Sequence, residues 1–189
     1  MGAEGAAPGA WVLTALDPAV RLALAPYQLS EAARHAAATL AQRPPRSVRE
    51  DLRTDTLEPI LDSLLQDLGA SVHLRRLLSV DVTPVLAAAM SALGATSGLL
   101  RLEVVRDRSC PKWHVDRLRL RLGCTLHGAG TEYLPPGMDP DSAVATDLKH
   151  VPNSTFFAMA GSGTGLGLWH RSPHACDQHP RLFLALDLG

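Results

Sequence analysis

Residues 114–126 read HVDRLRLRLGCTL, and the strict alternation in this stretch decides the fold class of the second half of the chain. Successive side chains of a β-strand point to opposite faces of the sheet. His114 and Asp116 would therefore share one face with the leucines and Cys124, while the arginines would share the other. The arginines are Arg117, Arg119 and Arg121. Because the leucine face must be buried, the pattern predicts a strand that directs an imidazole and a carboxylate, about 7 Å apart, into the interior.

Short alternating runs separated by Gly, Pro, Asn and Asp continue through residues 98–189. Such runs are typical of strands and turns. The predicted strands are 99–107, 114–126, 130–134, 143–149, 155–160, 166–171 and 181–188. Six or seven short strands within about 90 residues favour an antiparallel sandwich or barrel, with the helices packed outside it.

The first half of the chain is predicted to be mainly helical. Residues 29–42 are rich in good helix formers, and the leucines of 57–68 recur at the spacing of one helix face. A third helix is expected over 83–93, with Thr83 as its N-cap and Pro84 at its first position. The first of these is expected to be a surface helix, whereas the second and third each have an apolar face that would pack against a core.

These patterns predict one α+β domain over residues 1–189. Its mainly helical part, 1–97, would pack on a β-rich part, 98–189, with an antiparallel jelly-roll-like (double-stranded β-helix) core.

Composition narrows the classes of partner. Eighteen basic residues stand against nineteen acidic ones, so nothing indicates a nucleic acid or an anionic membrane. Three cysteines are too few for a disulfide framework and indicate a reducing compartment. The chain begins without a basic signal-peptide region, and no apolar run reaches about 18 residues. We therefore expect a cytoplasmic protein that acts on a small molecule or a protein substrate.

A buried carboxylate at Asp116 needs a compensating cation or hydrogen-bond donors, and a metal ion is one candidate. A His-x-Asp pair can supply two ligands of a facial triad for non-haem Fe(II) if a second histidine arrives from another strand. His170 lies 54 residues after Asp116, in phase with Leu168 on a predicted strand. The same pair could instead form a structural hydrogen bond in a metal-free interaction domain.

Arg181 begins the last predicted strand, 11 residues after His170. It shares a face with Phe183 and Ala185, so its guanidinium could bind the far carboxylate of a chelating 2-oxo acid. A structural cap on the barrel is the alternative role.

Other side chains could join or replace this site. Cys110 and Cys124 allow a zinc site with the same histidines, as in a non-catalytic zinc-binding protein of metal homeostasis. Glu132 could orient a ligand or pair with one of the arginines named above. His174 could make an auxiliary metal contact from a turn. The glycine-rich run 161–167, GSGTGLG, fits neither nucleotide-binding motif in register, and is expected to be a lid over the site or a plain hairpin loop.

Several segments together carry a resemblance to a known family. They read CPKWHVDRLRLRLGCT from 110, GAGTEYLP from 128, WHRSP from 169 and RLFLALDL from 181. This combination resembles the bacterial domain-of-unknown-function family 1826 (DUF1826), which by itself implies no activity.

The HxD…H…R order is also similar to that of the Fe(II)/2-oxoglutarate-dependent dioxygenases, whose core is a double-stranded β-helix. That resemblance implies Fe(II) bound by His114, Asp116 and His170, and 2-oxoglutarate anchored by Arg181. It implies an oxygenase of unknown substrate.

Overall fold

Residues 8–189 are described here from a computed structural model of the chain. Two antiparallel sheets form the β part, one with the strand order β1-β7-β4-β9-β3-β2 and one with the order β6-β5-β8. The large sheet consists of β1 (Leu22–Gln28), β2 (Arg46–Arg53), β3 (Ser97–Val105), β4 (Leu120–His127), β7 (Thr155–Ala160) and β9 (Arg181–Leu188). The small sheet consists of β5 (Glu132–Tyr133), β6 (Lys149–His150) and β8 (His170–Arg171).

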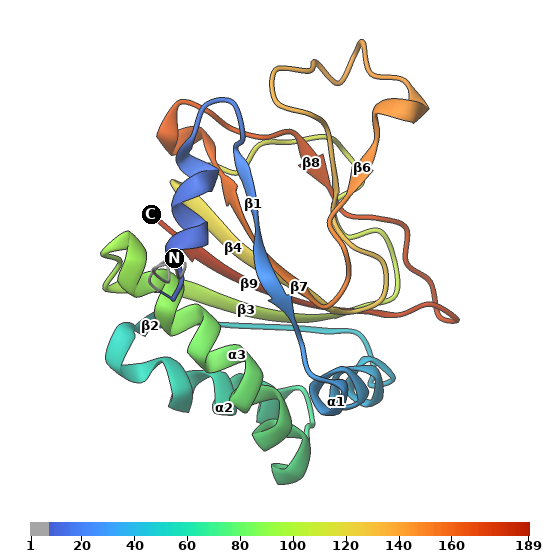
Figure 1. Ribbon diagram of the computed structural model, residues 1–189. Helices are drawn as coiled ribbons and strands as arrows, with labels where there is room; N and C mark the ends of the chain where they lie inside the picture. Colours follow the sequence, from blue (N-terminus) through green and yellow to red (C-terminus); the bar gives the residue numbers. More distant parts are fainter. Residues whose placement is uncertain (1–7) are drawn as a thin grey trace, which may run out of the picture.

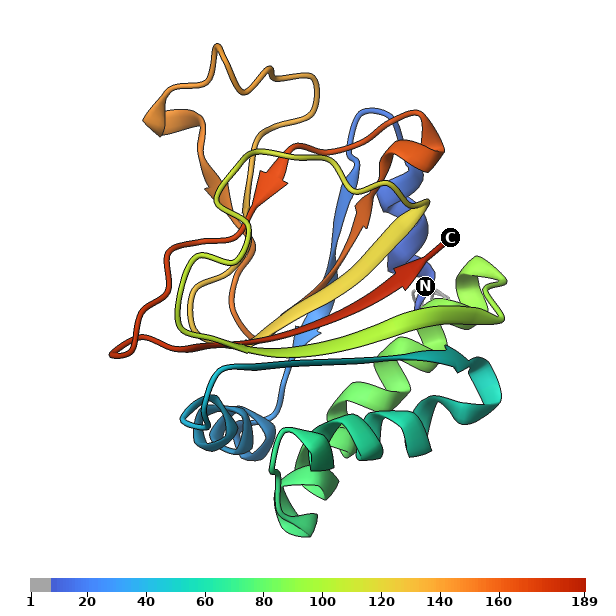
Figure 2. The ribbon, with the colours of Figure 1, turned by 180° about the vertical axis from the view of Figure 1, so that it is seen from behind.

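Helices cover only one face of the large sheet, as Figures 1 and 2 show from opposite sides. They are α1 (Glu31–Ala41), α2 (Leu57–Asp67) and α3 (Val72–Leu93). The 3-10 segment η1 (Ala10–Leu16) precedes them in the chain and packs on β1 and α3. Shorter 3-10 turns are η2 (Thr54–Thr56), η3 (Ala145–Asp147) and η4 (Ser162–Thr164). The long connection between β5 and β6 projects at the end of the molecule away from the helices.

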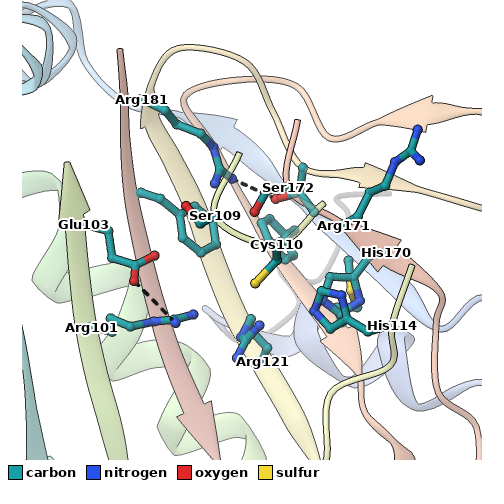
Figure 3. A pocket seen from close by; sticks show the side chains of 14 residues that line it. Arg101, Glu103, Ser109, Cys110, His114, Arg121, His170, Arg171, Ser172 and Arg181 are labelled. Carbon is teal, nitrogen blue, oxygen red and sulfur yellow. Dashed lines mark hydrogen bonds and ion pairs between the residues drawn. The ribbon is translucent and has the colours of Figure 1, made fainter. Parts of the chain in front are cut away.

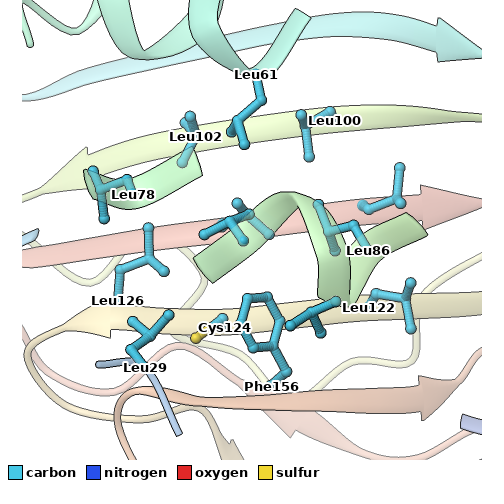
Figure 4. Close-up of a cluster of buried hydrophobic side chains, with 14 of the residues drawn as sticks. Leu29, Leu61, Leu78, Leu86, Leu100, Leu102, Leu122, Cys124, Leu126 and Phe156 are labelled. Carbon is cyan, nitrogen blue, oxygen red and sulfur yellow. The ribbon is translucent and has the colours of Figure 1, made fainter. Parts of the chain in front are cut away.

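The main hydrophobic core fills the space between the helices and the large sheet. Leu122 and Leu126 of β4 and Phe156 of β7 meet Leu78 and Leu86 of α3 there (Figure 4). This confirms the predicted helical layer packed on an antiparallel double-stranded β-helix. Because the helices lie on one face of the large sheet, its other face is turned toward the small sheet, and a site can form between the two sheets.

A second, smaller apolar cluster lies on that other face. It includes Phe157, Met159 and Phe183. Gly123 of β4 makes this packing possible, because a Cβ there would lie only 2.3 Å from the Phe157 ring. The inner face is therefore partly apolar, and the Phe157 ring covers β4 at Gly123.

The prediction for the third helix was wrong at its start. α3 begins at Val72, where the Ser71 side chain accepts a hydrogen bond from the Leu74 amide, so Pro84 lies in the helix interior. Proline removes the hydrogen bond to the carbonyl four residues earlier. That residue, Val80, is 66% exposed, so water can satisfy its carbonyl. By length and composition alone α3 could cross a membrane, but its buried residues belong to the core.

Two strands within residues 8–97, β1 and β2, were not predicted, and they form the two edges of the large sheet. β2 is exposed at nearly every position, and Leu52 is its only buried residue. An edge strand of this kind shows no hydrophobic alternation from which it could be recognised. The predicted strands 130–134, 143–149 and 166–171 each contract to two residues, in β5, β6 and β8.

The strand predicted over 114–126 begins only at Leu120. Its leucines face the helices as expected, but His114 and Asp116 precede the strand and reach the opposite face. The prediction that they share the leucine face was therefore wrong. His114 is held next to β8 by two backbone hydrogen bonds with His170, each 3.0 Å long.

Candidate metal centre

Three predicted ligands meet between the two sheets. One ligand atom from each of His114, Asp116 and His170 lies within 4.8 Å of the others. His170 is buried on β8, and its ring lies 4.4 Å from that of His114 between centroids. Figure 3 shows the two rings side by side on one wall of a cavity.

Each imidazole is held with its Nε2 atom free. Nδ1 of His114 lies 3.0 Å from the carbonyl of Lys112, and Nδ1 of His170 lies 3.0 Å from the carbonyl of Leu168. A carbonyl only accepts hydrogen bonds, so both Nδ1 atoms carry the proton. In the neutral ring Nε2 is then a lone-pair acceptor, which is the form that binds a metal.

The lone pairs converge on Asp116. Its carboxylate lies 3.2 Å from Nε2 of His170 and 3.9 Å from Nε2 of His114. Nε2 of His170 is buried and forms no hydrogen bond within the described part of the chain. Oδ2 of Asp116 has Arg121 as its cationic partner, and that arginine pairs with the carboxylate rather than with either imidazole. The two Nε2 lone pairs that face the carboxylate therefore suit a divalent metal.

Protonation favours the same conclusion. Burial is the main cause that lowers the pKa of His114 below its ordinary 6.5, so its ring is neutral at pH 7. Burial alone would raise the pKa of Asp116, but contacts with His170 and Arg121 hold it below the ordinary 3.8. The cluster therefore presents a carboxylate and a neutral imidazole.

Arg121 was predicted on the face opposite the leucines, and on that face the structure places it beside the cluster rather than in solvent. Its Nη1 lies 2.7 Å from Oδ2 of Asp116, and two further nitrogens bind Asp187 at 2.6 and 2.9 Å. Arg117 and Arg119 are exposed, as expected. Because Asp187 fixes the guanidinium, Arg121 can hold the Asp116 carboxylate in one orientation.

Arg181 is buried and carries an unpaired charge. It donates hydrogen bonds to the Ala129 carbonyl at 3.0 Å and to the hydroxyls of Thr125 and Thr131 at 3.1 and 3.0 Å. No carboxylate in residues 8–189 forms an ion pair with it. Burial is the main cause that lowers the pKa of Arg181 to about 10, and the charge of the Glu103 carboxylate opposes this shift.

Arg181 and the two histidines line one cavity of about 230 Å³. In Figure 3 the guanidinium lies at the far end of this cavity from the imidazoles. Thr125 and Thr131 were not predicted from the sequence, since a lone threonine gives no signal of its partner. The geometry can hold a metal at one end and a carboxylate at the other.

The auxiliary candidates are dispersed. Cys110 lines the same cavity. Cys124 is fully buried on the helix side of β4, where burial raises the pKa of its thiol, so it cannot reach the cluster. Glu132 binds Arg108 at 2.8 Å and Arg171 at 2.6 Å rather than an arginine of β4. His174 is exposed outside the cluster.

The glycine-rich run has a clear place in the site. The amides of Gly161, Ser162 and Gly163 donate to the carbonyls of Arg119, Asp116 and Leu118. The run is thus neither an open lid nor a plain hairpin. It is a 3-10 turn that docks on the segment bearing the His-x-Asp pair.

The sequence matches the family described as "Protein of unknown function (DUF1826)" over residues 10–187. The chain belongs to this family. No curated protein matches the sequence of this DUF1826 member.

Two solved structures share the fold of the DUF1826 chain. The dioxygenase for auxin oxidation 1 from Arabidopsis thaliana, in a complex with 2-oxoglutarate, is 11% identical with a TM-score of 0.60, over 98% of this chain and 90% of that one. A protein of the 2OG-Fe(II) oxygenase family from Caulobacter crescentus is 16% identical with a TM-score of 0.52, over 95% and 80%. At these identities the likeness establishes the double-stranded β-helix, and function must be argued from the site.

Proposed function

We propose that this protein is a non-haem Fe(II)/2-oxoglutarate-dependent oxygenase. The observation that carries the proposal is the pairing, in one cavity, of a proton-free His–Asp–His cluster with a buried arginine that lacks a carboxylate partner. The first feature suits a facial triad and the second suits the distal carboxylate of the cosubstrate. The oxygenases named above, which share the fold, support the same function.

Each residue then has a defined task. His114, Asp116 and His170 would hold Fe(II). Arg181, with the hydroxyl of Thr131, would bind the C5 carboxylate of 2-oxoglutarate, and Thr125 would orient the Arg181 guanidinium. Bound iron and cosubstrate supply the oxidation: O2 inserts one oxygen atom into a substrate C–H bond, while 2-oxoglutarate takes the other and becomes succinate and CO2. The two carbonyl contacts fix the imidazoles, and Arg121 fixes the carboxylate.

A non-catalytic zinc site would use the same three ligands and Cys110. It gives no reason for a buried, unpaired guanidinium at the other end of the cavity, which costs stability in the absence of an anion. Arg181 therefore favours the oxygenase over the zinc-binding alternative.

The test is an anaerobic titration of metal-stripped protein with Fe(II) and then 2-oxoglutarate. We expect the weak visible charge-transfer band that appears only when the 2-oxo acid chelates iron. Asp116→Ala should abolish it, and Arg181→Gln should raise the 2-oxoglutarate concentration for half-saturation by at least about tenfold, since a charge-assisted pair is lost. Arg117→Gln, at an exposed position, is the matched control and should titrate like wild type.

Other outcomes separate the alternatives. Tight zinc or iron binding without the band would point to a metal-binding protein without 2-oxoglutarate chemistry. If the protein bound no divalent metal, the metal-free interaction domain would be the remaining interpretation.

A further inference from the structure

We propose that the cavity holds a second anion-binding position at Arg101, and that the substrate is a small carboxylic acid bound there. This inference rests on the proposed oxygenase function for the identity of the ligand as a substrate. The binding position itself can be tested independently.

Arg101 projects into the cavity from β3. It lies opposite Ala185 in β9, and Ala185 lies opposite Gly123 in β4. Ala185 has a small side chain, and the Phe157 ring covers Gly123, so Arg101 stands beside an apolar part of the cavity wall. Figure 3 shows Arg101, with Glu103, on the wall across the cavity from His114 and His170. A ligand held by Arg101 would therefore extend toward the metal ligands.

The other arginines of the cavity differ in how fully they are paired. Arg121 binds two aspartates, and Arg171 binds Glu132 at 2.6 Å. Arg101 makes only a 3.5 Å contact with Glu103. The Arg101 Nε atom is buried and has no hydrogen-bond partner among residues 8–189. Unmet donors on a guanidinium in a cavity are suited to a carboxylate, which can accept two parallel hydrogen bonds.

Arg101 and Arg181 enter the cavity from well-separated backbone positions. Ala185, the partner of Arg101, lies four positions after Arg181 along β9. At the rise of a strand this corresponds to about 13 Å between the two backbone positions. The cosubstrate can occupy Arg181 while Arg101 stays available to a second acid.

The cavity also limits the size and charge of that acid. Its volume of about 230 Å³ is below the ~300–1,000 Å³ typical of drug-sized ligands, and the cosubstrate would take part of it. Phe157, Met159 and Phe183 offer an apolar wall for a short hydrocarbon or aromatic body. The Glu103 carboxylate beside Arg101 repels a doubly charged phosphate more than a single carboxylate. The surroundings therefore favour a small monocarboxylic acid.

The experiment measures carboxylate binding by saturation-transfer NMR on the full chain, loaded with redox-silent Zn(II) and saturated with 2-oxoglutarate. The probes are acetate, butyrate and benzoate, each paired with its uncharged amide. We expect at least one carboxylate to bind wild type, with its amide binding at least about tenfold more weakly. Arg101→Gln should weaken the binding of that carboxylate by a similar factor. Arg101→Lys should restore part of the affinity.

Arg49→Gln is the matched control, because exposed Arg49 lies opposite Arg101 on the edge strand β2 and outside the cavity lining. It should bind the probes like wild type. The proposal is overturned if no carboxylate binds, if the amides bind equally well, or if Arg101→Gln and Arg101→Lys both bind like wild type.

A parallel 2-oxoglutarate titration separates this proposal from the proposed function. Arg101→Gln should leave 2-oxoglutarate binding unchanged, while Arg181→Gln should weaken it. If wild type fails to bind 2-oxoglutarate, the oxygenase function is wrong, and the carboxylate series run without cosubstrate still decides whether Arg101 is an anion site.

Discussion

The two histidines of the cluster use the same local contact: each donates its Nδ1 proton to the carbonyl two residues earlier in the chain. The contact sets the tautomer before any ligand arrives, so Nε2 is oriented for a metal at little entropic cost. Arg121 acts similarly on the third ligand, Asp116. The free protein thus holds its ligand atoms in place by main-chain and ion-pair contacts.

The cysteines provide a prediction at the residue scale. Cys110 is exposed in the cavity, whereas Cys124 is fully buried and burial raises the pKa of its thiol. The thiolate is the reactive form, so we expect a thiol reagent to modify Cys110 in the native protein and Cys124 only after unfolding. Mass spectrometry of labelled peptides, with Cys110→Ser as control, measures this. Rapid native labelling of Cys124 would contradict the placement of β4 against the helices.

Residue patterns singled out the three residues that cluster in the structure, His114, Asp116 and His170, and also Arg181 in the same cavity as the two histidines, because each carries a chemistry that is unusual inside a strand-rich core. They did not predict Thr125, Thr131 or the Arg121–Asp187 pair. These contacts depend on which strands are neighbours and in which register. The pairing of Arg121 with Asp187 across β4 and β9 is a fact of topology, and no local sequence pattern encodes it.

At the scale of elements, the 3-10 turn η4 supports the segment that carries His114 and Asp116. The support requires close approach: a Cβ at Gly161 would lie 2.2 Å from the Leu118 carbonyl oxygen. Gly161 has an extended backbone, so its role is to make room rather than to adopt an unusual dihedral angle.

Gly161→Ala should therefore displace residues 116–119 and lower affinity for a divalent metal by about tenfold, as loss of support behind a ligand typically does. Gly165→Asn is the control, because Gly165 has open space around it and asparagine tolerates its positive φ. Calorimetric titration with Mn(II), alongside urea unfolding of the metal-free proteins, separates lost affinity from lost stability. If the two variants bound the metal with equal affinity, the turn would have no role in positioning His114 and Asp116.

The elements that were missed share a physical cause. β1 and β2 are edge strands with many exposed positions, so burial leaves little periodicity in their sequences. α3 extends through Thr83-Pro84, a pair that usually begins a helix, because tertiary packing of Leu78 and Val82 outweighs the local signal. The strongly periodic segments, α2 and β9, were found close to their observed limits.

At the scale of the whole molecule, the His114–Asp116–His170 cluster lies between two sheets that differ in strand length and in how far the hydrophobic core anchors them. The large sheet is anchored by the main core, whereas each strand of the small sheet has two residues. His170 belongs to the small sheet, while Asp116 pairs with Arg121 of the large one. Beyond the cluster, the small sheet is tied to the chain before β4 by the Arg108–Glu132 ion pair. A metal bound by all three ligands would therefore act as a clamp between the sheets.

Hydrogen exchange can detect this clamp. Metal that binds only the folded state stabilises it by about 2.7 kcal/mol at a concentration 100 times Kd. Because each strand of the small sheet has only two residues, we expect Mn(II) to slow exchange most in β5, β8 and residues 114–119, and least in β3 and β9, which lie against the main core. His170→Ala should show no such metal effect, whereas exposed His174→Ala should retain it. If Mn(II) protected both sheets equally in wild type, opening of the small sheet would be coupled to global unfolding, and the clamp would have no independent role.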